Sequence, residues 1–333
     1  MVDIGVEGYD GEAYDINNKG EAVGYIGAAP FIWDKVNGLR LLPRYPWPGG
    51  WDSAVADSIN EMDAVVGYAY DTMHSPALLP TALIWQNGEG FYLDNLIDQC
   101  GNGLRAHCWT AKDINDKGQI ALAASISTSD DPPSAIWGHA IMLNPRGPAI
   151  YRATSLKVHG NAGEFGIPLS LDPDAERSIE PRYPGPTKVV FEFDVPVKAN
   201  DGSLDIGDEV CTNIPGDNIV GLDLDGRFLT VWLNRAVNNS NFRIDIEDGP
   251  DGITDLYGNP LRADRPTYVI IRSILGEVVG GPPVTIMDLG LIKSQLNKPV
   301  TENNFRCDIN ADGIITIFDL GLAKSNLMQP FPN

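Results

Sequence analysis

The chain has 333 residues, and its 45 Asp plus Glu outnumber its 24 Lys plus Arg, giving a formal net charge of −21. This charge argues against nucleic acids and anionic membranes as partners, because both require a basic surface. No stretch reaches the roughly 18 consecutive apolar residues of a membrane-spanning helix, so we expect no membrane insertion. The 35 Gly and 25 Pro indicate frequent turns, which exclude a protein of long helices and favour a mainly β fold.

A short motif occurs three times in the first 145 residues. The copies read AYDINNKGEAVGY, ADSINEMDAVVGY and AKDINDKGQIALA, and they begin at Ala13, Ala56 and Ala111. The turn sequences NNKG and NDKG contain residues that adopt positive φ at little cost, so we expect hairpins at 17–20 and 115–118. Each copy therefore predicts about four short strands in one antiparallel sheet, which must stack on its neighbours to bury a face.

A second apolar stretch follows each motif and ends at Trp33, Trp85 and Leu143. Large aromatic residues at repeated positions more often fill a shared core than bind a sugar. We therefore expect Trp33 and Trp85 to occupy equivalent, mostly buried places. A period of about 40 to 55 residues is typical of propeller blades and similar arrays, so the segment predicts a propeller-blade-like array.

The order A-x-D-I-N-x-x-G-x-x-V-G, followed by two apolar residues and Trp, resembles the HAF-type repeat of bacterial extracellular proteins. VDIG at 2–5 is similar to the end of one such repeat, whereas Leu122 replaces a glycine of the pattern in the third copy. The resemblance covers roughly residues 1–145 and implies an exported protein without implying a reaction. The N-terminus has no basic start and no apolar run, so we expect an N-terminally truncated portion of a larger exported protein.

Four later segments show period-two alternation of apolar residues, as expected for strands with one face on a core. Their core-facing positions would be Val189, Phe191, Phe193, Val195, Leu229, Val231, Leu233, Phe242, Ile244, Ile246, Tyr268 and Ile270. Such strands between turns such as DGS, PGD and GNP predict a β-sandwich. FEFDVPV and ITDLYGNPL resemble strand sequences of bacterial Ig-like domains, which implies an Ig-like domain over residues 150–273 with a spacing or adhesive role.

The C-terminal segment contains a duplication. VTIMDLGLIKSQL at 284–296 and ITIFDLGLAKSNL at 315–327 are copies, and the stretches from LGL onward predict two amphipathic helices. The second copy overlaps the twelve residues DINADGIITIFD, which place oxygen donors and a turn glycine in the register of a calcium loop. We expect one Ca2+ there, held by the carbonyl of Ile314 and by the side chains of Asp308, Asn310, Asp312, Thr316 and Asp319.

Two loop–helix units without the entering helix of an EF-hand resemble the type I dockerin, a duplicated calcium module that docks onto cohesin modules. The resemblance covers residues 275–330 and implies a cohesin-like or other surface protein as partner. The first loop departs from the pattern, because Val, Gly and Pro replace expected ligands and the turn glycine. We expect weak calcium binding or none there, since its only oxygen-bearing side chains in register are Glu277, Thr285 and Asp288.

In dockerins, loop positions 10 and 11 help to select the partner. Here they are the apolar pairs Ile286–Met287 and Ile317–Phe318, and Lys293 and Lys324 follow on the same predicted helices. These residues either form a docking face or, in the case of the apolar pairs, close the small core of the module itself.

No HExxH, GxSxG, P-loop or CxxC motif occurs, and His74, His107, His139 and His159 lack ligand spacing. We therefore expect no enzymatic activity. Cys100 and Cys108 would close a small disulfide loop in an oxidising compartment, and the alternative is that all four cysteines are reduced thiols.

These features predict a mainly β, non-enzymatic, extracellular or cell-surface modular protein. A HAF-type repeat region (1–145) leads into an Ig-like sandwich (150–273) and a dockerin-like calcium module (275–330) that attaches the chain to a protein partner, in polysaccharide degradation or surface assembly. Two alternatives stay open. The repeats could belong to a propeller that binds or cleaves a polysaccharide and is carried by the dockerin-like module, or that module could be a calcium-stabilised cap without a partner.

Overall fold

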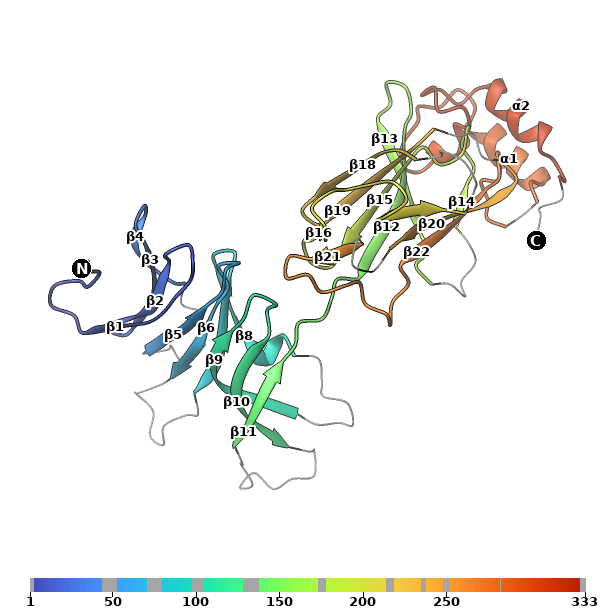
Figure 1. Cartoon of the computed structure of the whole chain (residues 1–333). Coiled ribbons are helices and arrows are strands. Elements are labelled where there is room, and N and C mark those ends of the chain that lie inside the picture. The colour runs from blue at the N-terminus through green and yellow to red at the C-terminus, as the bar shows by residue number, and fades with distance from the viewer. Residues whose placement is uncertain are drawn as a thin grey trace. The chain divides into compact units, whose positions relative to one another are not determined.

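The computed structural model describes residues 3–43, 53–70, 80–97, 105–127, 138–172, 178–213, 219–234, 238–247, 249, 252–281 and 283–329. Within these residues the fold is mainly β, with two short α-helices near the C-terminus (Figure 1). The chain divides into two compact units, Met1–Pro145 and Arg146–Asn333. The prediction of a mainly β chain is confirmed.

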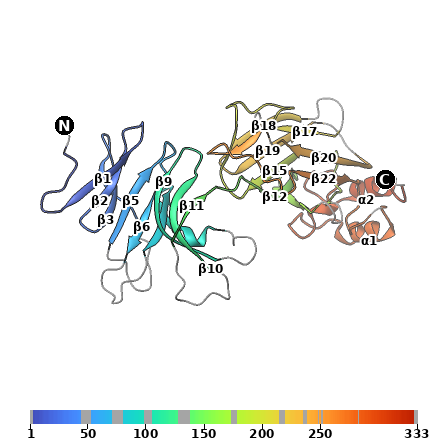
Figure 2. The same ribbon diagram turned by 60° about the horizontal axis from the view of Figure 1, so that its bottom comes forward.

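The described strands of the first unit follow one another along the chain and form three antiparallel sheets (Figure 2). The strands are β1 Gly11–Ile16, β2 Ala22–Ile26, β3 Ala29–Asp34, β4 Gly38–Leu41, β5 Ser53–Ile59, β6 Val65–Tyr70, β7 Thr81–Gln86, β8 Glu89–Tyr92, β9 Arg105–Ile114, β10 Ile120–Ser127 and β11 Gly138–Leu143. The sheet orders are β1-β2-β3-β4, β5-β6-β7-β8 and β11-β10-β9, so the third sheet has three described strands rather than the expected four. A 3-10 turn, η1 (Leu93–Asn95), follows β8.

The two expected hairpin turns lie where the sequence predicts them. The N–H of Gly20 donates to the carbonyl of Asn17 at 3.0 Å, and the N–H of Gly118 donates to the carbonyl of Asn115 at 2.9 Å. Both glycines have positive φ, of 81° and 70°, a conformation in which a side chain is strained. The predicted hairpins at these positions are confirmed.

The last glycine of the repeat motif, Gly24 or Gly67, lies against a backbone carbonyl of the preceding strand. This contact leaves no room for a side chain. A Cβ at Gly24 would lie 1.9 Å from the carbonyl oxygen of Glu12, and a Cβ at Gly67 would lie 1.9 Å from that of Val55. In the third sheet Leu122 takes this place, and the β9–β10 pairing shifts register twice where the earlier sheets shift once. The altered register accompanies the loss of the glycine.

Asparagine side chains join the turns of successive sheets. The side-chain amide of Asn17 donates to the carbonyl of Asn60 at 3.2 Å, and that of Asn60 donates to the carbonyl of Asn115 at 3.1 Å. The middle sheet also contributes side chains to two apolar clusters, one shared with each neighbouring sheet. The repeat sheets therefore stack on their neighbours, as in a repeat array.

The two repeated tryptophans occupy equivalent places. Trp33 pairs with Ala22 across β2–β3, and Trp85 pairs with Val65 across β6–β7. Trp85 is buried (2 % exposed) in the cluster between the first two sheets, whereas Trp33 is only half-buried. Burial is thus confirmed for Trp85 and wrong in part for Trp33, because no sheet among the described residues packs on the corresponding face of the first sheet.

The second unit begins with two sheets that share one apolar core, and we call its residues 146–273 the sandwich. Its strands are β12 Ile150–Val158, β13 Glu164–Leu169, β14 Ser178–Glu180, β15 Lys188–Phe193, β16 Val197–Ala199, β17 Val210–Thr212, β18 Ile219–Asp225, β19 Phe228–Leu233, β20 Ser240–Ile246, β21 Ile253–Asp255 and β22 Tyr268–Ser273. One sheet has the order β13-β12-β15-β19-β18 and the other β14-β22-β20-β17, with β14 parallel to β22; β16 and β21 form a separate pair.

Most of the predicted core-facing residues lie in this shared core. Those that are buried are Val189, Phe191, Phe193, Leu229, Val231, Leu233, Phe242, Ile244 and Ile246. Val195 is an exception, because it lies beyond the end of β15 and is 37 % exposed.

The predicted face of β22 is wrong by one residue. Val269 and Ile271 are buried in the core, whereas Tyr268 and Ile270 are half-buried on the opposite face. Adjacent residues of a strand point to opposite faces, so the short apolar run allowed either assignment. On the outer face, the Arg243 guanidinium lies 3.9 Å from the centre of the Tyr268 ring, which accounts for an aromatic residue there.

The C-terminal part of the second unit contains a 3-10 turn, η2 (Phe305–Cys307), and the helices α1 (Ile286–Gln295) and α2 (Ile317–Ser325). Thr285 and Thr316 are the N-caps, and each forms a capping box with the Asp three residues later. The helices therefore begin three residues before the LGL sequences from which they were predicted, because the capping threonine fixes the start.

The two loop–helix copies contact each other reciprocally. The N–H of Asn297 donates to the carbonyl of Ile315, and the N–H of Met328 donates to the carbonyl of Val284, both at 2.9 Å. Each donor follows one helix and each acceptor precedes the other helix. The sequence duplication is therefore matched by a duplicated set of contacts.

Candidate functional site

The segment 308–319, which we call the acidic loop, connects η2 to α2. Its first and last residues, Asp308 and Asp319, are wholly buried (0 % exposed). Among the described residues, neither carboxylate has a Lys or Arg within ion-pair distance. Burial raises the pKa of Asp319, and the charge of Asp308 raises it further. Two buried carboxylates without a Lys or Arg partner are unfavourable unless hydrogen bonds or a bound cation compensate them.

The two oxygens of Asp308 have different surroundings. Oδ2 accepts from Nδ1 of His159 at 2.8 Å and from the N–H of Gly313 at 2.9 Å, whereas Oδ1 accepts only a long bond of 3.3 Å from the N–H of Asp312. Nε2 of His159 lies 3.3 Å from Nη1 of Arg182. A guanidinium can only donate, so Nε2 accepts and the proton is on Nδ1. One oxygen of Asp308 is thus held firmly, and the other is available to a cation.

The middle of the acidic loop is held by short-range hydrogen bonds. The side-chain amide of Asn310 donates to Oδ2 of Asp312 at 2.8 Å, and the N–H of Ile314 donates to Oδ1 of Asp312 at 3.0 Å. Gly313 has a φ of 92° and supplies the sharp turn. Thr316 caps α2, and its hydroxyl donates to Asp319 at 3.3 Å. All six predicted ligand residues therefore lie in one loop, with Asn310 and Asp312 bonded to each other.

The acidic loop is a candidate calcium site. Nowhere in the described part of the chain do three or more His, Cys, Asp or Glu side chains converge so as to hold a metal ion. The acidic loop contributes two buried carboxylates, and its remaining predicted donors are also oxygens, the atoms that Ca2+ prefers. The donor chemistry fits calcium, provided that Asn310 and Asp312 exchange their mutual hydrogen bond for the ion.

In the equivalent first loop, 277–288, the two carboxylates have different surroundings. Asp288 accepts four hydrogen bonds of 2.8 to 3.0 Å, three from the backbone N–H groups of Val278, Val279 and Thr285 and one from the Thr285 hydroxyl. Glu277 accepts one bond from the N–H of Gly280, and its Oε2 is buried without a partner. Burial raises the pKa of Glu277 to about 7, which favours its neutral form. Pro282 lies outside the described residues.

The two apolar pairs at the helix starts are exposed. Ile286–Met287 and Ile317–Phe318 are between 66 % and 76 % accessible, and Lys293 and Lys324 are exposed on the same helices. The core of this region is formed instead by other residues, among them Ile292, Ile309, Ile315 and Ala323. The alternative in which the pairs close the core of the module is therefore wrong.

The acidic loop packs against the turn between β12 and β13. The N–H of Gly160 donates to the carbonyl of Ala311 at 3.1 Å, and a Cβ at Gly160 would lie 2.0 Å from the carbonyl oxygen of Asp312. His159, which precedes this glycine, contacts Asp308 across 149 residues of sequence. Sequence reasoning missed His159, because a contact over that distance leaves no local pattern.

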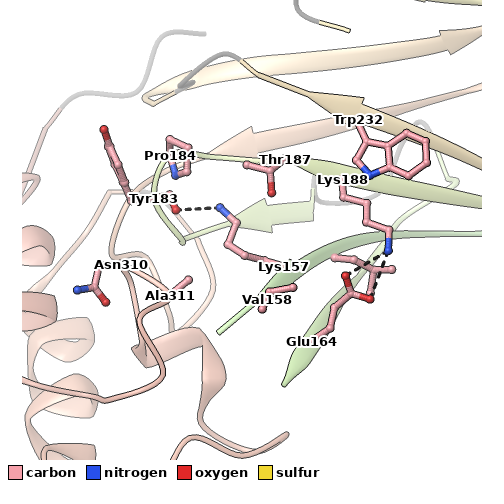
Figure 3. Close-up of a pocket in the computed structure, with 11 residues that line it drawn as sticks. Lys157, Val158, Glu164, Tyr183, Pro184, Thr187, Lys188, Trp232, Asn310 and Ala311 are labelled. Atoms are coloured by element: carbon pink, nitrogen blue, oxygen red, sulfur yellow. Dashed lines mark hydrogen bonds and ion pairs between the residues drawn. The ribbon is translucent and has the colours of Figure 1, made fainter. Parts of the chain in front are cut away.

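A hollow of about 520 Å³ lies beside this contact, lined by β12, β13, β15, β19 and the acidic loop (Figure 3). Its cationic side chains are already engaged. Nζ of Lys157 donates to the carbonyls of Tyr183 and Gly185 at 2.9 and 2.6 Å, and Lys188 forms an ion pair of 3.2 Å with Glu164. Burial also lowers the pKa of Lys157 to about 8. The hollow therefore offers no ready anion site.

Cys100 and His74 lie outside the described residues, so the alternatives for a Cys100–Cys108 bridge stay as predicted. Burial raises the thiol pKa of Cys211 and of Cys307 to about 11. Both thiols therefore favour the protonated form at neutral pH.

The helices of the described residues, ten and nine residues long, are too short to cross a membrane.

Comparison with protein families, with curated proteins and with solved structures found no match to the chain.

Proposed function

We propose that the chain is a non-catalytic, exported modular protein whose C-terminal segment (275–330) is a dockerin-like module. In this proposal the acidic loop binds one Ca2+ and the module attaches the chain to a cohesin-like surface protein. The HAF-type, propeller-blade-like repeats and the Ig-like sandwich would act as spacer or adhesive modules, in polysaccharide degradation or surface assembly.

The burial of Asp308 and Asp319 is the observation that carries the calcium proposal. Both carboxylates are 0 % exposed, lack a Lys or Arg partner within the described residues, and belong to a loop whose other donors are oxygens. A bound Ca2+ would supply the missing positive charge. Its binding energy would also stabilise a loop that keeps two like charges close together.

Calorimetric titration of the chelator-treated full chain with calcium tests this proposal. We expect one binding site, and we expect Asp308→Asn to abolish it because the substitution removes the charge of the first ligand while preserving its shape. The variant Asp288→Asn changes the first-loop counterpart of Asp319 and should leave binding intact, because the first loop lacks other expected ligands and the turn glycine. Two strong sites, or none, would contradict the proposal.

The exposed pairs Ile286–Met287 and Ile317–Phe318 support attachment to a protein. Single exposed apolar residues are common on protein surfaces, but here the same kind of pair is exposed twice at equivalent positions of a duplicated motif. We take this repeated exposure of large apolar side chains as support for an interaction site.

Binding to recombinant cohesin modules, measured with calcium and with a chelator, tests the attachment. We expect binding only with calcium, and at least a tenfold loss when all four apolar residues are changed to Asp. The control is Val36→Asp, because Val36 is 90 % exposed but lies in the first unit. Calcium binding without any cohesin binding would favour the alternative of a calcium-stabilised cap.

A further inference from the structure

The contact between the sandwich and the acidic loop is built from fully buried polar groups. His159 and Asp308 are both 0 % exposed, and their hydrogen bond of 2.8 Å joins the β12–β13 turn to the first residue of the loop. The bond fixes Oδ2 of Asp308 and leaves Oδ1 with only one long bond. This is the arrangement by which outer residues orient a metal-binding carboxylate.

His159 is itself held in place on several sides. Nη1 of Arg182 lies 3.3 Å from its Nε2, and Arg182 is anchored by two bonds of 2.7 and 2.8 Å to Glu180. The rings of Phe165 and Phe305 meet the imidazole edge-on, with centroids 5.4 and 5.9 Å away. The imidazole of His159 therefore cannot rotate without losing the hydrogen bond from Arg182 and disturbing its packing against the two phenylalanine rings.

The backbone around His159 and the loop also fits closely. A Cβ at Gly313 would lie 2.8 Å from the carbonyl oxygen of His159, and Gly160 leaves no room for a Cβ beside the carbonyl of Asp312. The N–H of Tyr183 donates to the carbonyl of Ile309 at 2.6 Å. Gly313, the turn glycine of the acidic loop, therefore packs directly against the backbone of the sandwich.

We propose that the sandwich is part of the calcium site, with His159 as a positioning residue that orients the Asp308 carboxylate for the ion. This inference rests on the proposed calcium binding. It follows that calcium affinity depends on the docking of the acidic loop against the β12–β13 turn. Linkage requires the reverse effect as well, so bound calcium stabilises that docking to the same extent.

Calcium titration of full-length His159 variants tests the inference. His159→Leu removes the donor to Asp308, and we expect at least a tenfold weaker affinity, the lower end of the loss typical for such positioning residues. His159→Asn keeps an N–H donor near the position of Nδ1 and should stay within about threefold of the wild type, in keeping with a role for the donor itself. Val231→Ala, in the sandwich core, controls for a general loss of stability and should bind calcium normally.

Hydrogen exchange of the wild-type chain gives a second measurement that does not require any variant to fold. We expect calcium to slow exchange of the Gly160 N–H, which donates to the acidic loop. Three results would each overturn the inference. The first is an unchanged exchange rate at Gly160, and the second is a calcium affinity of His159→Leu equal to that of the wild type. The third is an equal loss of calcium affinity in the Leu and Asn variants. If the wild type binds no calcium, both the proposed function and this inference are wrong. If it binds calcium but shows none of these effects, only the inference is wrong.

Discussion

Individual buried charges in the second unit are compensated by different means. Burial alone would raise the pKa of Glu180, but the Arg182 guanidinium, together with Lys157 and Ser155, outweighs burial and lowers it. Asp288 is compensated by backbone N–H groups and Thr285. Glu277 has only one hydrogen bond and becomes easier to protonate. These carboxylates therefore affect stability with different signs as pH changes.

Removing the charge of Glu277 should stabilise the protein above neutral pH. Its pKa rises from 4.5 to about 7 on folding, so folding takes up a proton between these values, and the carboxylate opposes folding as pH rises through about 7. We expect Glu277→Gln to gain about 2–3 kcal/mol in unfolding free energy at pH 8 and nearly nothing at pH 4.5. Urea denaturation at several pH values measures this, and a gain that does not vary with pH would contradict it. The exposed Glu302, changed to Gln, is the control.

Arg182 should be far more important than a surface arginine with a similar ion pair. Arg182 and Glu180 are wholly buried, so Arg182→Leu leaves an uncompensated charge and should lower the unfolding free energy by about 3–5 kcal/mol. Arg152 also pairs with a carboxylate, Glu192 at 2.6 Å, but its side chain is 62 % exposed. We expect Arg152→Leu to cost about 1 kcal/mol or less. Equal losses in the two variants, measured by chemical denaturation, would show that the buried pair is not structurally important.

At the level of elements, the repeat sheets are joined through their turns as well as their apolar faces. Asn60 is 3 % exposed, its side-chain oxygen accepts two backbone bonds within its own turn, and its amide reaches the next turn. Asn115 makes the same bonds within its turn, but its amide bonds only Gln119 among the described residues. The middle asparagine therefore both shapes a turn and links two sheets.

Asn60→Ala should destabilise the first unit more than Asn115→Ala. The first substitution leaves two turn N–H groups, one of them buried, without an acceptor and breaks the bond to the next sheet, so we expect a loss of about 2–3 kcal/mol. The second acts on an exposed turn at the end of the series and should cost about 1 kcal/mol. Denaturation followed by tryptophan fluorescence compares them. Equal losses would mean that only the turn, and not the link between sheets, contributes to stability.

The sequence predicts those elements whose signals are local. The turns ending at Gly20 and Gly118 follow from residues that tolerate positive φ, and the duplicated helices follow from a motif copied 31 residues apart. Predictions that depend on a partner elsewhere in the chain were less successful. The face of β22 was wrong because neighbouring residues were all apolar, and His159 was missed because Asp308 is 149 residues away.

At the scale of the whole molecule, the sandwich and the C-terminal helices share their packing. Phe165 of β13 stacks on Phe305 of η2 with the ring centres 5.3 Å apart, and it packs against the apolar cluster around Ile292. A second cluster joins Ile179 of β14 to Val284, which precedes α1. Apolar contacts of this kind make the two parts depend on each other for burial, as within a single cooperative domain.

The sandwich and the C-terminal helices should therefore unfold together, in one transition distinct from that of the first unit. We expect Phe242→Ala in the sandwich and Ile292→Ala in α1, each costing about 2–5 kcal/mol, to lower the same calorimetric transition by roughly 5–15 °C. Val65→Ala in the first unit should lower only the other transition, since the two units have separate cores. Scanning calorimetry of the full chain in millimolar calcium measures these shifts. An early, separate transition in Ile292→Ala, with the sandwich transition unmoved, would show that the helices fold independently and that their contacts with the sandwich contribute little to stability.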